Sequence, residues 1–176
     1  AFLQAQFGLW NRTRYGCIPT DPCSCNYPGG DDNYITCEGE AGRNTTVTTI
    51  HFGDFDSYKP LQGTIGEDIG VLTDLVSLDL CCNEMNGIIP ESITKLTKLQ
   101  HLSLADNYFH GTLPQSIGDL RSLRSLSVEH NYLSGSIPAS FSAFVAINGT
   151  LKMLGVYCNR FTGVLPSIDW AQITYD

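Results

Sequence analysis

A pattern of leucines that recurs along the chain restricts its possible folds more than any other feature. The segment that begins at Leu75 has leucines at its first, fourth and sixth positions, and the pattern begins again at Leu99, 24 residues later, and at Leu123. A fourth copy begins at Leu151 and a looser one at Val47. Because one such unit cannot bury its apolar side chains alone, consecutive copies must stack. The sequence therefore predicts a solenoid of five repeats.

Three further residue types recur in fixed phase with the leucines. Asn follows each predicted strand, where an amide can pair with backbone groups left inside a turn. Gly suits positive φ or close approach, and Pro fixes φ where no donor is needed. Apolar spacing after each Pro, as at Ile93 and Ile117, predicts a helical or 3₁₀ turn. A Leu-rich amphipathic helical bundle would not explain the fixed phase. The columns are Asn83, Asn107, Asn131 and Asn159; Gly63, Gly87, Gly111, Gly135 and Gly163; and Pro90, Pro114, Pro138 and Pro166.

The shared phrase L-x-x-L-x-L-x-x-N-x-L-x-G-x-I-P resembles the plant-type leucine-rich repeat of polygalacturonase-inhibiting proteins and receptor-kinase ectodomains, over residues 47–169. The resemblance implies an α/β solenoid: a right-handed superhelix with a parallel concave sheet, short convex 3₁₀ or helical turns and a disulfide-bearing N-terminal cap. The cap is expected in residues 1–46, as a helix plus a Cys-rich loop. Residues 47–176 are expected to form five repeats, with residues 170–175 as the strand of a partial sixth.

The balance of charge argues against polyanionic partners. The net charge is −8, with a pI near 4.8, so neither nucleic acid nor an anionic membrane surface is expected to bind. Residues 1–91 contain 4 basic and 13 acidic residues, whereas residues 92–176 contain 6 and 5. No run of about 18 apolar residues is present, so membrane insertion is not expected. The chain opens at Ala1, as a product with its signal peptide removed would.

Seven cysteines bear on the compartment. Four of them lie in a Gly- and Pro-rich stretch and lack the paired Cys-x2-Cys spacing that zinc sites usually have, so disulfides are favoured over a zinc site. One of the adjacent cysteines Cys81 and Cys82 is expected to reach the cap or the insertion in the first repeat, around residues 54–60. Cys158 repeats the position of Cys82 about 14 Å away, too far for a disulfide, and is expected to be a free, partly buried thiol or an intermolecular link. The disulfide candidates are Cys17, Cys23, Cys25, Cys37, Cys81 and Cys82.

Glycosylation sequons support the same compartment. Asn11, Asn44 and Asn148 each precede the required hydroxyl residue by two positions, so N-linked glycans are expected there. Together with the predicted disulfides, they indicate the secretory pathway and an extracellular or cell-surface location.

The residues between the core leucines of each strand are expected to line an open concave face. That face is small, polar and mildly acidic. Tyr157 and Arg124 are the residue types most often found in binding hot spots. The candidate ligand-binding residues are His51, Asp79, His101, Ser103, Asp106, Arg124, Ser127, Glu129, His130 and Tyr157.

Chemistry on this face is not expected. His101, Asp106, Glu129 and His130 suggest a metal hypothesis, but solvated polar residues on a strand face are far commoner. Asp54 and Asp56 lack the acidic spacing of a calcium loop. Neither a G-x-S-x-G elbow nor an H-E-x-x-H motif is present, and the glycines are in structural phase. We therefore predict neither enzyme activity nor a metal or other cofactor.

Two functions remain from different classes. The first is a non-enzymatic extracellular module that recognises a protein, peptide or glycan. The alternative is a structural subunit that assembles head-to-tail with copies of itself into a filament, for which an uncovered terminal strand and an acidic N-terminal half are suited.

Overall fold

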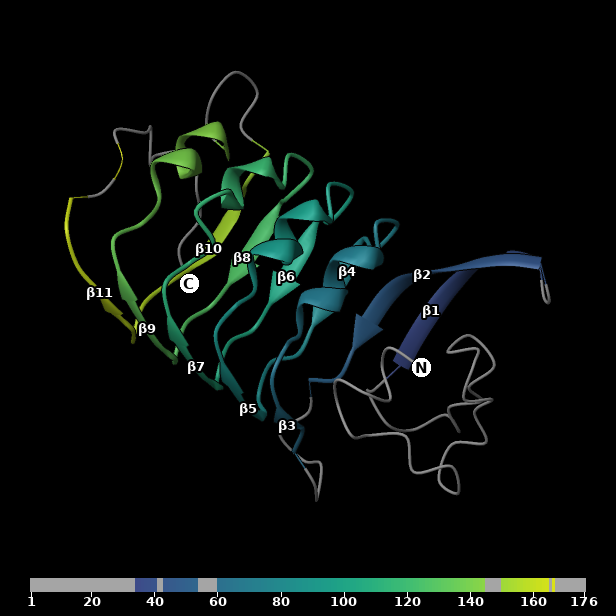
Figure 1. Ribbon diagram of the computed structural model, residues 1–176, viewed down its shortest axis with the longest axis horizontal. Helices are drawn as coiled ribbons and strands as arrows, with labels where there is room; N and C mark the ends of the chain where they lie inside the picture. The colour runs from purple at the N-terminus through teal and green to yellow at the C-terminus, as the bar shows by residue number, and fades with distance from the viewer. Residues whose placement is uncertain (1–33, 41–42, 54–59, 145–149, 165, 167–176) are drawn as a thin grey trace.

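A computed structural model provides the structure of the chain, and it describes residues 34–40, 43–53, 60–144, 150–164 and 166. The repeats stack side by side along the long axis (Figure 1). Each turn of the solenoid contributes one strand to each of two sheets, and in the described residues four of the five turns also contribute a short 3₁₀ helix on the opposite side. The predicted leucine-rich-repeat solenoid is therefore confirmed.

The first sheet has the strand order β1-β2-β4-β6-β8-β10. Its repeat strands run parallel and pair in register, so that Ile50, Leu78, Leu102, Leu126 and Leu154 form one row. All five side chains are buried, and their neighbours alternate to the opposite face. The parallel strands are β2 (Arg43–His51), β4 (Ser77–Asp79), β6 (His101–Ser103), β8 (Ser125–Ser127) and β10 (Met153–Gly155).

A β-hairpin leads into the repeats and was not among the predicted elements. Strand β1 (Tyr34–Glu40) pairs antiparallel with β2, and Ile35 and Cys37 pack against the core. Because β2 continues unbroken from Arg43 to His51, the expected boundary at residue 46 falls inside a strand. The β-branched run around Val47 explains this continuity, since such side chains suit a pleated surface. The expected cap helix with Leu3, Phe7 and Trp10 lies outside the described residues.

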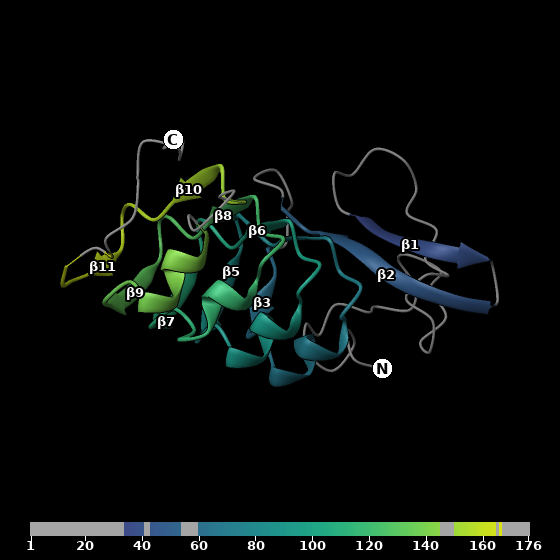
Figure 2. The ribbon, with the colours of Figure 1, turned by 90° about the horizontal axis from the view of Figure 1, so that it is seen from above.

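A second sheet, of five strands, was also not among the predicted elements. In each repeat its strand follows the turn after the first-sheet strand. Its order is β11-β9-β7-β5-β3, and it buries Met85, Phe109 and Leu133. Figure 2 shows the first-sheet strands of the repeats and the 3₁₀ helices on opposite sides of the stack. Its strands are β3 (Gln62–Gly63), β5 (Glu84–Gly87), β7 (Tyr108–Gly111), β9 (Tyr132–Gly135) and β11 (Arg160–Phe161).

The glycine column ends four of these second-sheet strands, and Gly163 follows the fifth, β11, by two residues. Gly87 has φ +86, and a Cβ there would lie 2.8 Å from Thr64 Cγ2. Left-handed backbone and close packing of neighbouring turns therefore both require glycine at this position. The expectation of positive φ or close approach is met in both respects.

The predicted convex turns are 3₁₀ helices. In three of them an N–H closes the turn onto a Pro carbonyl, as when Ile93 donates to Pro90 over 3.1 Å. Proline fits because it sets φ and its missing donor is not needed there. The helices are η2 (Glu67–Val71), η3 (Glu91–Lys95), η4 (Ile117–Asp119) and η5 (Ala139–Phe144).

The asparagine column forms the expected ladder. Asn107 Oδ1 accepts the backbone N–H of Met85 over 2.9 Å, and its Nδ2 donates to the carbonyls of Leu80 and Ala105 over 2.8 and 2.9 Å. Asn83, Asn131 and Asn159 make equivalent bonds in their own repeats. Each amide thus pairs groups that the turn would otherwise bury unsatisfied.

In the part of the chain that is described, no helix has the length and apolarity needed to cross a membrane.

Candidate binding face

The strand register brings the predicted concave residues onto one face of the first sheet. His51, Asp79 and Ser103 occupy one column, which Ser127 continues. His101 lies in the neighbouring column, between Ser77 and Ser125. These side chains are exposed or half-buried, so the face is open to solvent and its centre consists of short hydroxyl side chains.

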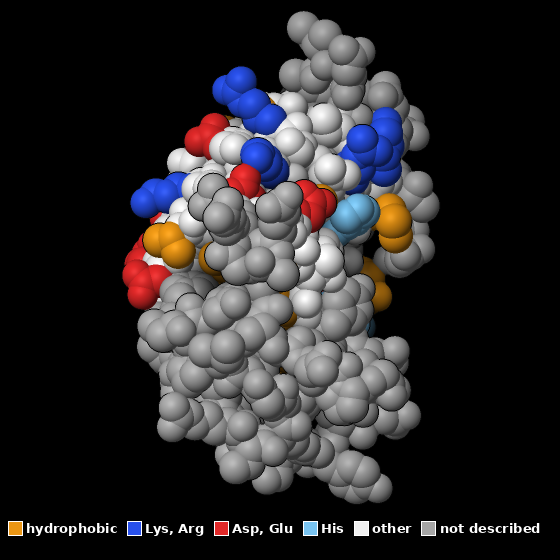
Figure 3. All heavy atoms as spheres, turned by 90° about the vertical axis from the view of Figure 1, so that its right-hand side faces the viewer, with side chains coloured by type: hydrophobic (Ala, Val, Ile, Leu, Met, Phe, Trp, Pro, Cys, Tyr) orange, Lys and Arg blue, Asp and Glu red, His pale blue; other side chains and the backbone are white. Residues whose placement is uncertain are grey.

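One rim of this face is basic. Arg124 and Lys152 directly precede β8 and β10, and Lys152 N–H donates to the Arg124 carbonyl over 2.7 Å. Both residues are exposed, as are the adjacent His101 and Met153. Figure 3 shows Lys and Arg side chains gathered beside a His and hydrophobic side chains at the upper end of one flank. Sequence reasoning included Arg124 but missed Lys152, although both stand one residue after the first leucine of their repeats.

The opposite rim, at the ends of the strands, is acidic. Asp79 Oδ2 lies 3.1 Å from His51 Nδ1, while its Oδ1 accepts the backbone N–H of Cys81 over 3.1 Å. Asp106 and Glu129 follow β6 and β8 in the same region of their repeats. Among the described residues, Glu129 Oε2 is buried without a hydrogen-bond partner. Its carboxylate lies over Gly155, where any Cβ would overlap it.

The adjacent cysteines beside this rim correct one prediction. Both are free thiols, and Cys82 Sγ lies 2.9 Å from Cys81 Sγ. Neither forms the expected disulfide: Cys81 Sγ packs over Gly53 in the first repeat, and Cys82 Sγ lies against Cys81 Sγ. Burial raises the pKa of Cys81, as do its hydrogen bonds with Cys82 and Asp79. Burial also raises the pKa of Cys82, and the charges of Asp106, Asp79 and Glu129 raise it further, whereas the hydrogen bond with Cys81 lowers it.

Of the five remaining cysteines, the structure describes Cys37 and Cys158. Cys158 is a free thiol, but it is exposed and not partly buried as expected. Cys37 is disulfide-bonded. Cys17, Cys23 and Cys25 lie outside the described residues.

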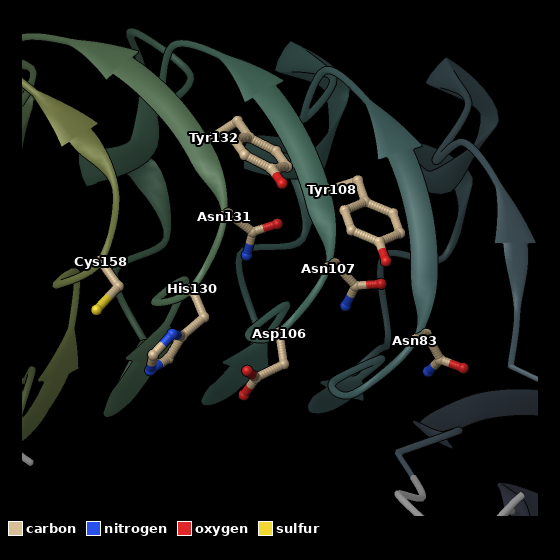
Figure 4. A pocket seen from close by; sticks show the side chains of 8 residues that line it. All are labelled: Asn83, Asp106, Asn107, Tyr108, His130, Asn131, Tyr132 and Cys158. Atoms are coloured by element: carbon tan, nitrogen blue, oxygen red, sulfur yellow. The ribbon is translucent and has the colours of Figure 1, made fainter.

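The turns that follow β4, β6, β8 and β10 each place one residue in left-handed backbone. Cys82, Asp106, His130 and Cys158 have φ values of 61°, 51°, 52° and 51°. Asp and His are among the non-glycine residues found most often in this region. Because the turn recurs from repeat to repeat, the side chains of Asp106, His130 and Cys158 form a row next to the asparagine ladder, as Figure 4 shows.

A pocket of about 380 Å³ lies along this row. The rings of Tyr108 and Tyr132 stack above it, with centroids 6.2 Å apart and 19° between their planes. The Arg160 guanidinium lies 5.0 Å from the Tyr132 centroid, and His130 meets Tyr157 edge-on at 5.2 Å. The lining residues are Asn83, Asp106, Asn107, Tyr108, His130, Asn131, Tyr132 and Cys158 (Figure 4).

Sequence reasoning missed the tyrosines and Arg160 because it considered only the first-sheet columns. The signal was present, since Tyr108, Tyr132 and Arg160 each follow the asparagine of their repeat.

The four residues of the metal hypothesis are not brought together. His101 opens strand β6, whereas Asp106, Glu129 and His130 lie beyond the other ends of their strands. In the described ranges, no three His, Cys, Asp or Glu side chains are close enough to hold one metal ion.

Comparisons with known proteins agree with this architecture. Residues 73–133 match the family model described as "Leucine rich repeat". No curated protein sequence matches the chain. The ectodomain of the receptor kinase SOBIR1 from Arabidopsis thaliana is 25% identical, with a TM-score of 0.69, over 88% of this chain and 80% of that one.

Two complexes are also similar. A chain of the BIR3–SERK2 complex from Arabidopsis thaliana is 30% identical, with a TM-score of 0.63, over 76% of this chain and 66% of its own. The plant peptide hormone receptor RGFR1, in complex with RGF2, is 30% identical, with a TM-score of 0.62, over 73% of this chain and 20% of its own. This chain therefore spans less than two thirds of the length of either protein.

Proposed function

Because the chain is a leucine-rich-repeat protein of the plant type, we propose that it is a recognition module that binds a peptide, or an extended segment of a protein, on its concave face. The observation that carries the proposal is the in-register face of the first sheet, with short side chains at its centre and rims of opposite charge. The similar structures support it, because they include a peptide hormone receptor in complex with RGF2 and a complex of BIR3 with SERK2.

The centre of the face suits a polypeptide backbone. Ser77, Ser103, Ser125 and Ser127 carry short side chains whose hydroxyls both donate and accept hydrogen bonds. An extended chain lying across the strands can approach this surface closely and pair its own N–H and C=O groups there.

The two rims set the orientation of the ligand. Arg124 and Lys152 attract a carboxylate at the strand starts, whereas Asp79, Asp106 and Glu129 attract a cationic group at the strand ends. Complementary charges of this kind contribute more to orientation and association rate than to affinity.

The remaining properties of the proposed module come from the sequence. We propose an extracellular or cell-surface location, N-linked glycans on Asn11, Asn44 and Asn148, and a function without catalysis or cofactor. Of the three acceptors, Asn44 lies in strand β2, and Asn11 and Asn148 lie outside the described residues.

A peptide-display selection tests the concave face. A random-peptide library is selected on the full chain, and the enriched peptides are titrated against Arg124→Glu/Lys152→Glu and against Lys95→Glu/Arg121→Glu. The second pair makes the same charge change at exposed residues away from the concave face. We expect the first pair to weaken binding at least tenfold and the second to leave it unchanged. Failure to enrich any peptide, or equal loss in both variants, contradicts the proposal.

The filament alternative depends on residues 170–175, which lie outside the described ranges. Light scattering of the same purified chain tests it. A monomer at micromolar concentration contradicts assembly, whereas polymers that disappear when residues 170–176 are deleted support it.

A further inference from the structure

The pocket between the asparagine ladder and the stacked tyrosines brings a carboxylate and exposed aromatic rings into one cavity. From its geometry we propose that it binds the guanidinium group of an arginine in the bound polypeptide, with Asp106 as the anionic partner and the Tyr108–Tyr132 stack as the wall. The inference rests on the proposed function, because it names the side chain by which that ligand is read.

Asp106 supplies an unpaired charge. In the described part of the chain, its carboxylate makes neither a hydrogen bond nor an ion pair, although the residue is half-buried and lines the pocket. Its backbone is held on both sides, because its N–H donates to the Glu129 carbonyl and its carbonyl accepts the N–H of Asn83. A ligand can therefore pair with this carboxylate, which a fixed turn holds in place, without breaking a hydrogen bond inside the protein.

The surrounding charges favour a cation. Glu129 and Asp79 lie near enough to act, with Asp106, on the thiol of Cys82, whose pKa all three carboxylates raise. Glu129 Oε2 is also buried without a partner in the described residues. The basic side chains nearby are His130, which follows Asp106 in the same row and meets Tyr157 edge-on, and Arg160 beside Tyr132. The three carboxylates of this region outnumber the Arg160 guanidinium, so the local field favours a cationic ligand over an anionic one.

The spacing of these carboxylates favours an extended cation over a metal ion. Among the residues described, no three His, Cys, Asp or Glu side chains converge on one point. A planar guanidinium presents five donors spread over several ångströms and stacks on aromatic rings. It can therefore satisfy Asp106 and contact the tyrosine wall at the same time.

The tyrosine wall already accommodates one guanidinium. Strand β9 lies between β7 and β11, so Tyr132 has the ring of Tyr108 on one side and Arg160 on the other, 5.0 Å from its centroid. Tyr108 and Tyr132 remain 49% and 45% exposed. Each ring covers one face of the other, and a second guanidinium can contact the exposed part of the Tyr108 ring as Arg160 contacts Tyr132.

The floor of the pocket adds shape but few free polar groups. The amides of Asn83, Asn107 and Asn131 are committed to backbone groups of the ladder. The volume of about 380 Å³ lies within the range of small-ligand sites, and it leaves room for a side chain that enters from the concave face.

The test uses small probes on the full chain. N-acetyl-arginine amide, its lysine counterpart and its neutral citrulline counterpart are titrated into isotopically labelled protein and followed by NMR. We expect the arginine probe to shift the resonances of Asp106, Tyr108 and Tyr132, the lysine probe to bind at least threefold more weakly, and the citrulline probe at least tenfold more weakly. Equal binding of lysine or citrulline, or shifts confined to other residues, overturns the proposal.

Two variants locate the charge. Asp106→Asn keeps the shape of the side chain and a residue that tolerates left-handed backbone, and we expect it to weaken the arginine probe at least tenfold. Asp119→Asn removes the same charge from an exposed position in η4 and should leave binding unchanged. Undiminished binding to Asp106→Asn overturns the assignment.

The outcome is separable from that of the peptide selection. If selected peptides bind the concave face but are insensitive to Asp106→Asn, and the arginine probe leaves the pocket unshifted, this inference fails while the proposed function stands. If the arginine probe binds but no peptide is enriched, the pocket stands and the proposed function fails.

Discussion

Oδ1 of Asn107 accepts the backbone N–H of Met85, 22 residues earlier in the chain, over 2.9 Å. The same side chain donates to the carbonyls of Leu80 and Ala105, so one amide joins the turns of two repeats. Because Asn107 is buried, water cannot replace these bonds when the side chain is removed.

We therefore expect Asn107→Ala to lower the free energy of unfolding by about 1–3 kcal/mol, the cost of leaving buried backbone groups unpaired. Urea titration followed by circular dichroism measures the change. Asn86→Ala, at an exposed position of β5, is the control and should stay within about 0.5 kcal/mol of the wild type. An unaltered midpoint for Asn107→Ala would show that the ladder does not stabilise the stack.

The glycine column offers a second stability test. Gly87→Ala adds a Cβ at φ +86 and 2.8 Å from Thr64 Cγ2, so both strain and crowding oppose it. We expect a loss of about 1–2 kcal/mol for the left-handed backbone alone. Adding Thr64→Ser removes the crowding methyl and should recover part of any loss beyond that. A double variant no more stable than Gly87→Ala would assign the whole effect to backbone conformation.

Glu91 links stability to acid. Burial is the largest single influence on the pKa of its carboxyl and raises it, but hydrogen bonds from Ser116, through its N–H at 2.8 Å and its side chain, and from the N–H of Gln115 at 3.0 Å together outweigh burial, so the net shift of the pKa is downward. Because the folded pKa lies below the unfolded value, which is about 4.3, the stabilisation is complete above that pH and is lost as the pH falls through the folded pKa.

We expect Glu91→Gln to remove the part of the pH dependence of stability that comes from Glu91. The exposed position limits the effect to about 0.5 kcal/mol at neutral pH. Urea midpoints at pH 7 and pH 3 measure it, with Asp119→Asn as a control that should keep the acid dependence of the wild type. If Glu91→Gln lost as much stability between the two pH values as the wild type, the contacts with Ser116 and Gln115 would have no role in it.

The free thiols should differ in reactivity. Burial raises the pKa of Cys81 and Cys82, so little thiolate is present at pH 8, whereas Cys158 is exposed. Since the thiolate is the nucleophile, we expect iodoacetamide to label Cys158 at least tenfold faster than either Cys81 or Cys82, as measured by peptide mass spectrometry. Equal rates at the three positions would contradict the burial of the adjacent pair.

The repeat pattern alone determined the central part of the fold. The phase of Leu, Asn, Gly and Pro was enough to predict stacked strands, the asparagine ladder and the convex turns, and the resemblance to leucine-rich repeats implied that the strands form a parallel sheet. These features could be predicted because each depends on contacts with the same position of the next repeat, which sequence spacing specifies. The concave columns could be predicted for the same reason, from the alternation of side chains along a strand.

The tertiary structure decided what depends on the direction of the chain between those positions. Whether Tyr108, Tyr132 and Arg160 stack, and whether Asp106 is left unpaired beside them, follows from the turn that leads into the second sheet. The contact of the Cys82 thiol with the Cys81 thiol, and not with a distant cysteine, depends on the left-handed backbone of Cys82. These contacts depend both on backbone dihedral angles and on side chains from adjacent turns. Residue spacing in the sequence does not specify the two together.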